Sequence, residues 1–132
     1  MPIKHLNPDS MHKNPAFSQG IIIPANAKIL VIGGQNAVDK QGEIVGKGDM
    51  AAQTTQALDN LITVLEEAGG TLDDLIRVGI YFKAGEDLNA GFGAWMKKAG
   101  NIKNPPTVTG VQVVGLARPD YLIEIEATAI LP

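Results

Sequence analysis

Apolar residues recur at helical spacing in two stretches of the chain. The first begins after Asp49, a residue type that often caps helix N-termini, and ends at the glycine pair 69–70. The second, residues 87–100, predicts a helix that ends at Gly100 and is weakened by internal glycines. The buried face predicted for the first helix is made by Ala51, Leu58, Leu61, Ile62, Leu65 and Ala68.

Runs rich in β-branched and apolar residues predict the strands. Two short strands are expected at 17–23 and 27–34, joined by a Pro-Ala-Asn turn. Residues 38–49 predict a hairpin-like excursion with residues 40–42 at its tip. Three longer strands are predicted over 75–83, 107–116 and 121–130.

This order of elements predicts an α+β fold in one domain, residues 1–132, preceded by a polar N-terminal segment, 1–15. We expect one mostly antiparallel sheet with two helices on one face. The other face is expected to carry Val108, Val114, Leu122 and Ile130. Because these side chains are too apolar for water, the sequence predicts self-association through that face.

The last predicted strand places two carboxylates in an otherwise apolar run. Glu124 and Glu126 share one face of the strand, and the alternate positions on the other face are plainly core. The alternation leaves two interpretations open. The two acids are either solvated or paired, or they point at a ligand.

Composition narrows the possible partners. The 132 residues include 11 Lys and Arg against 14 Asp and Glu, giving a net charge of −3. Nucleic-acid binding is disfavoured, because it normally needs a basic patch. There is no cysteine, which removes disulfides and thiolate chemistry. No apolar run is long enough to span a membrane and no signal peptide is visible, so we expect a soluble, cytoplasmic protein.

Several familiar motifs fail on spacing. Residues 42–47 superficially suggest a phosphate loop, but the loop is too short and no Ser or Thr follows Lys47. His5 and His12 have no carboxylate at ligand spacing, so no metal or other cofactor is predicted. Ser10 and Ser18 are the only serines, and neither stands in a nucleophile-elbow context.

Five segments in succession carry a family resemblance: FSQGI, VIGGQ, the run from GEIVGKGD to GIYF, NPPTVTGVQVVGL and IEIEATAI. From about Pro15 to Ile130 the chain resembles the Rid family of reactive intermediate deaminases, also called the YjgF or L-PSP endoribonuclease family. The resemblance implies a chorismate-mutase-like fold, a homotrimer whose sheets form a central barrel, and ligand clefts between subunits. Active members hydrolyse reactive enamines and imines, such as 2-aminoacrylate, to 2-keto acids and ammonia.

The resemblance also implies roles for individual residues. Glu124 matches the glutamate that holds the attacking water, Asn89 matches a helix asparagine, and Gly34 with Gln35 matches a Gly-Gln pair. At four positions this chain departs from the family's polar pocket. Phe17 replaces a tyrosine, Gly33 a serine, Val108 the arginine that grips the substrate carboxylate, and Gly110 a residue that is often cysteine.

With valine at the position of the arginine, three functional hypotheses remain. An arginine–carboxylate contact contributes roughly 2–4 kcal/mol, so its loss predicts an approximately 30-fold to 1,000-fold slower turnover of 2-imino acids. Arg118, in the loop before the last strand, is a possible replacement. The chain is then a Rid-type hydrolase of a neutral or differently charged imine, a non-catalytic trimer that binds a small metabolite, or an endoribonuclease. The acidic composition makes the third hypothesis the weakest.

Overall fold

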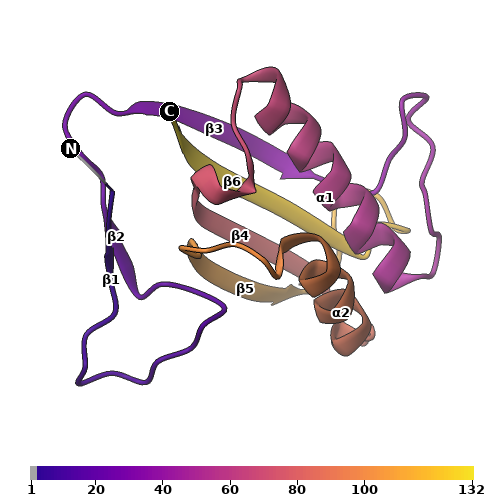
Figure 1. The fold of residues 1–132 in the computed structure, drawn as a ribbon. Helices are drawn as coiled ribbons and strands as arrows, with labels where there is room; N and C mark the ends of the chain where they lie inside the picture. The colour runs from indigo at the N-terminus through magenta and orange to yellow at the C-terminus, as the bar shows by residue number, and fades with distance from the viewer. Residues whose placement is uncertain (1–2) are drawn as a thin grey trace.

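A four-stranded mixed sheet forms the centre of the molecule, as seen in a computed structural model that describes residues 3–132 (Figure 1). The strand order is β3-β6-β4-β5. Strand β6 runs antiparallel to β3 and β4, whereas β5 runs parallel to β4. The bounds are Lys28–Gln35 for β3, Leu75–Lys83 for β4, Thr107–Val113 for β5 and Ile123–Leu131 for β6.

Two helices cover one face of this sheet (Figure 1). They are α1, Met50–Glu67, and α2, Leu88–Ala99. A short 3-10 helix, Leu72–Asp74, leads from α1 into β4. The α+β architecture predicted from the sequence, with both helices on one face of a mostly antiparallel sheet, is therefore confirmed.

Helix α1 begins and ends where its local chemistry predicts. The Asp49 carboxylate accepts a hydrogen bond from the Ala52 amide at 3.0 Å, and Gly69 after the helix has a φ of 83°. The helix residues that are fully buried against the sheet include Leu58, Leu61 and Leu65. The other predicted core positions of α1, Ala51, Ile62 and Ala68, are half-buried.

A buried amide on α1 fixes the two loops at the far end of the sheet. Gln53 is fully buried, and its Nε2 donates to the carbonyl oxygens of Gly46 and Asp120 at 3.2 and 2.9 Å. Its Oε1 accepts from the Leu122 amide at 2.9 Å. Each polar atom of this side chain therefore has a partner, as burial requires.

The N-terminal segment holds a strand that the sequence does not predict. Strand β1, Lys4–Leu6, pairs antiparallel with β2, Gly20–Ile22, and this small sheet stands beside the main one (Figure 1). The predicted strand 17–23 is thus shorter and pairs with β1. The predicted polar segment begins at Met1 and Pro2, which lie outside the described residues.

Ser18 anchors the N-terminal segment to the entrance of β5. Its hydroxyl donates to the Pro105 carbonyl oxygen at 2.6 Å and lies 2.9 Å from His5 Nδ1. Because the Ser18 hydroxyl donates its hydrogen to a carbonyl, its contact with His5 has a structural role and helps to hold the N-terminal segment in place.

The hairpin-like excursion is reduced to one isolated bridge, between Val38 and Ile44. At its tip Gly42 has a φ of 80°, and the Asp39 carboxylate accepts from the amides of Gln41 and Glu43. The turn chemistry that the sequence indicates is present, although no extended hairpin forms.

The predicted composition of the uncovered face is wrong in two places. Val108 pairs with the fully buried Val78 and packs against the core beneath the helices. Leu122 precedes β6 and is itself buried in that core. Ile130 lies opposite Ile29 but is only 7% exposed, and Val114 follows the end of β5. The exposed apolar residues of the uncovered face are instead Ile29, Val31 and Val111.

Candidate functional site

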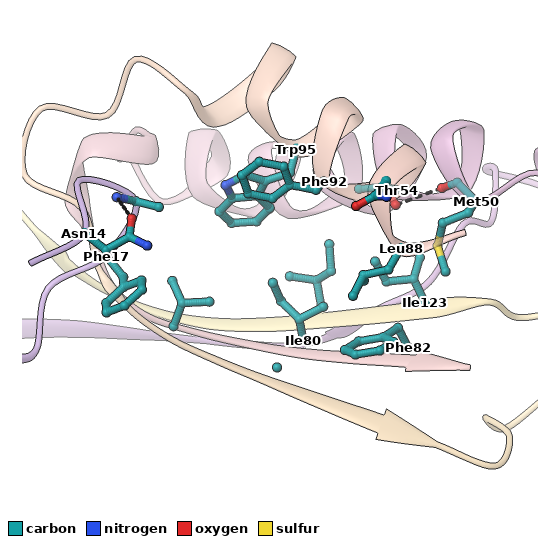
Figure 2. A pocket seen from close by; sticks show the side chains of 16 residues that line it. Asn14, Phe17, Met50, Thr54, Ile80, Phe82, Leu88, Phe92, Trp95 and Ile123 are labelled. Carbon is teal, nitrogen blue, oxygen red and sulfur yellow. Dashed lines mark hydrogen bonds between the residues drawn. The ribbon is translucent and has the colours of Figure 1, made fainter. Parts of the chain in front are cut away.

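A pocket of about 420 Å³ lies between the helices and the sheet (Figure 2). Phe92 and Trp95 of α2 lie on one side of it, and Ile80 and Phe82 of β4 lie on the other. Phe17, from the N-terminal segment, closes one end. Four aromatic rings from three separate parts of the sequence thus line a single pocket.

Four of the predicted site residues meet in this pocket. Phe17, Asn89, Val108 and Gly110 all line it. A Cβ added to Gly110 would lie 3.6 Å from the Phe82 ring, an ordinary contact distance. The space beside Phe82 therefore exists because residue 110 has no side chain.

The pocket walls contain no ionisable side chain among the sixteen described residues that line it. The polar side chains are those of Asn14, Thr54 and Asn89. The Thr54 hydroxyl donates to the Met50 carbonyl oxygen at 2.8 Å, and Asn14 Oδ1 accepts from the Ala16 amide at 2.8 Å. The cavity is consequently apolar and uncharged, with carboxamides as its main polar groups.

Glu124 lies on the opposite face of the sheet from this pocket. Its neighbours Ile123 and Ile125 both line the pocket, so strand alternation directs Glu124 away from it. Asn36 Nδ2 donates to Glu124 Oε1 at 3.2 Å. Any side chain on Gly34 would overlap the Glu124 carboxylate, which lies directly over that glycine.

Glu124 and the four predicted residues that line the pocket therefore lie on opposite faces of the sheet. Gly33, Gly34 and Gln35 end strand β3, and Gly34 is in contact with Glu124. Gln35 Nε2 donates to the Gly33 carbonyl oxygen at 3.1 Å. Gln35 lies opposite the buried Ile125 in the strand register, so it does not share the face of Glu124. We call Gly34 and Glu124 the Glu124 cluster. Within one chain they do not meet the pocket residues.

Arg118, the candidate replacement for the family's arginine, does not line this pocket within one chain. It is absent from the described lining of the pocket, and its Nη1 donates to the Gly42 carbonyl oxygen at 3.0 Å. Its guanidinium carbon lies 5.3 Å from the centre of the Tyr121 ring. Arg118 ties the excursion after β3 to the loop before β6.

Glu126 is paired. Its Oε1 accepts a hydrogen bond from the Tyr81 hydroxyl at 2.9 Å and forms an ion pair with Arg77 at 3.3 Å. The interpretation of Glu126 as a paired, structural acid agrees with these contacts. Tyr81 and Asn36, the partners of the two acids, were not predicted, because each lies far from its acid in the sequence.

The Tyr81–Glu126 contact predicts a pH effect. The hydrogen bond to Glu126, followed by that carboxylate's charge, raises the pKa of Tyr81 above 10.0. The folded state therefore favours the protonated phenol. Stability from this contact, measured against Tyr81→Phe, should be complete below about pH 10 and lost as the pH rises through the native pKa.

Absorbance of phenolate provides the measurement for Tyr81. The difference between the titrations of the native protein and of Tyr81→Phe isolates this residue from Tyr121, the only other tyrosine. A midpoint at or below 10 in that difference would show that the Glu126 contact does not hold the proton.

The amino-acid sequence is similar to those of known proteins. The family model described as Endoribonuclease L-PSP matches residues 9–131. A RutC family protein of Pyrococcus horikoshii is 43% identical over 101 residues, covering 76% of this chain and 77% of that protein.

Solved structures agree. A Rid-family protein of unknown function from Yersinia pestis is 35% identical, with a TM-score of 0.86, and the match covers 99% of this chain and 100% of that one. TdcF of E. coli, solved with bound serine, is 25% identical with a TM-score of 0.71, covering 92% and 91%.

The fold defines an α+β protein of the YjgF class, with two helices on one face of a mixed sheet. The chain belongs to the Rid/YjgF family, whose family model carries the L-PSP name. Within residues 3–132, no helix is long and apolar enough to cross a membrane. The same residues contain no cluster of three His, Asp or Glu side chains that could hold a metal ion.

Proposed function

We propose that this protein is a Rid-type hydrolase of imines or enamines that works in a cleft shared by two copies of the chain. One copy supplies the pocket, and its neighbour in a homotrimer supplies the Glu124 cluster. The observation that carries the proposal is the position of these two groups on opposite faces of one sheet. Since a single chain cannot present both to one substrate, the site requires a second copy.

The uncovered face of the sheet supports this assembly. Val31 is 76% exposed there, Ile29 is 51% exposed, and Val111 is 41% exposed. Apolar side chains grouped on the face of a sheet are typical of surfaces that another chain covers. If three identical copies pack through this face in a ring, the same cleft forms between each pair of neighbours.

Glu124 would act as the general base. Its carboxylate accepts a proton from water as the water oxygen bonds to the imine carbon, and the C=N electron pair moves to nitrogen, which takes up a proton. Glu124 then accepts the hydroxyl proton of this carbinolamine and returns it to the amino nitrogen as the C–N bond breaks, which releases ammonia and leaves a carbonyl compound. Asn36 and Gly34 support the step, because the first donates to the carboxylate and the second leaves space for it.

Val108 makes a 2-imino acid a poor substrate for this cleft. It lies in the pocket wall, and no described lining residue offers a cation to a carboxylate. TdcF, by contrast, was crystallised with serine, a ligand that carries a carboxylate. We expect hydrolysis of 2-aminoacrylate to be weak and hydrolysis of an uncharged imine to be faster.

A non-catalytic metabolite-binding trimer is the second candidate, because the pocket itself contains no acid or base. The two candidates differ in turnover. Imines released by an amine oxidase, or 2-aminoacrylate released by a dehydratase, are followed by ammonia formation with and without the protein. Absence of any acceleration over spontaneous hydrolysis for both imines would leave only the binding function.

Mixing two inactive variants tests the shared cleft. Gly110→Ile obstructs the pocket beside Phe82, and Glu124→Gln removes the base. Each should be inactive alone, whereas random 1:1 assemblies should regain activity in about one cleft in four, those with both halves intact. The assemblies are formed by refolding the two chains together. A mixture as inactive as its parents would contradict a cleft shared in this way.

A further inference from the structure

The pocket has room for a larger molecule than a small imino acid. An engineered apolar cavity of about 150 Å³ can hold benzene. This pocket, at about 420 Å³, can therefore accept an aromatic ring with a substituent of several atoms. Its volume is within the range of roughly 300–1,000 Å³ that is typical of small-molecule sites.

The rings around the cavity favour an aromatic occupant. Phe92 and Trp95 lie on the helix side of the pocket, and Ile80 and Phe82 lie on the sheet side (Figure 2). A flat ring in the pocket therefore has aromatic side chains on both walls. Aromatic pairs of this kind are favourable beyond the area they bury. The glycine at position 110 leaves the space next to Phe82 that such a ring needs.

The charge of the occupant is limited by the same walls. Leu88 and Phe92 are about half exposed in the single chain, so the pocket is open on that side. In a cleft closed by a neighbouring copy, burial of a carboxylate without a counter-charge would be costly, and Val108 offers none. Asn14 and Asn89 supply carboxamides to the lining, and a carboxamide can bond to one neutral polar group such as C=NH or C=O. The preferred ligand is therefore uncharged, with a single polar group on an apolar frame.

We propose that the pocket selects uncharged imines or enamines that carry an aromatic ring, and that it rejects their 2-carboxylate counterparts. This inference rests on the proposed function, because it treats the pocket as one half of the reaction cleft. It names the substrate class of that cleft: imines whose hydrolysis yields aryl-substituted aldehydes or ketones.

A matched pair of product analogues tests the selection by binding alone. Phenylacetone and phenylpyruvate differ only in a methyl group against a carboxylate. Trp95 is the single tryptophan of the chain and lines the pocket, so its fluorescence reports occupancy. We expect phenylacetone to bind at least about tenfold more tightly, with calorimetry as the second measurement.

Three substitutions test whether the preference belongs to the pocket. Val108→Arg should reverse it in favour of phenylpyruvate, whereas Val114→Arg, at a position 93% exposed, should leave it unchanged. Gly110→Ile should abolish binding of both ligands. It should not weaken folding, because a β-branched residue suits a strand and its Cβ has room.

The outcomes separate this inference from the proposed function. Equal or tighter binding of phenylpyruvate by the native protein overturns the inference, and so does tighter binding of 2-phenylethylammonium, which would indicate a cation–π cage. Selective binding of phenylacetone without turnover of any imine would sustain the pocket assignment and refute the hydrolase. Fast hydrolysis of imines without a preference between the two ligands would support the hydrolase and refute the selection of uncharged aromatic substrates.

Discussion

Glu124→Gln should lower the rate of imine hydrolysis by about 10²–10⁴-fold, the usual contribution of a positioned general base. Glutamine has nearly the same shape as glutamate, and its oxygen can still accept the Asn36 hydrogen bond. Folding stability should therefore change by less than about 1 kcal/mol. Initial rates of ammonia release, compared at equal concentrations of folded protein, provide the measurement.

A second substitution shows whether the position of the carboxylate matters. Gly34→Ala places a methyl group where the Glu124 carboxylate lies, and it should displace that flexible side chain at little cost to folding. Activity should fall while Trp95 still reports ligand binding in the pocket. Unchanged rates in both Glu124→Gln and Gly34→Ala would remove Glu124 from the mechanism.

Val31→Asp should convert the protein from trimer to monomer and, with it, abolish hydrolysis. Val31 is 76% exposed in the single chain, so the substitution leaves the core of that chain intact. In an assembled barrel the same position would bury three like charges without partners, which is strongly unfavourable. Sedimentation velocity should show the shift in mass, with a stability change near 0.5 kcal/mol at most for the separated chain.

Met11→Asp is the matched control for assembly. Met11 is an apolar residue, 47% exposed, in the N-terminal segment and outside the main sheet. It should sediment as the unmodified protein does. A trimeric Val31→Asp protein would show that this face is not the assembly surface, and a monomeric unmodified protein would refute the trimer altogether.

Local signals in the sequence were sufficient for the helices and for the long strands. The Asp49 cap and the glycine at 69 bound α1, and the predicted strand 75–83 coincides with β4. Strand β1 was missed because three residues carry little periodicity, and its pairing with β2 is a long-range contact.

The faces of the strands could not be predicted in the same way. Alternation correctly separated Glu124 from Ile123 and Ile125 within β6. It could not relate β5 to β6, because these strands are not adjacent and β4 lies between them. Val108 was accordingly assigned to the uncovered face, whereas the register with Val78 directs it toward the helices.

Residues on the two faces of this sheet can be substituted independently of one another during evolution. Changes at positions 108 and 110, or along α2, can alter which molecule fits without contact to Glu124 or to Val31. After gene duplication, one descendant could acquire a new ligand while Glu124 and the assembly surface that we propose stay the same. Two such descendants would still be able to co-assemble, and their mixed trimers would present clefts of more than one specificity.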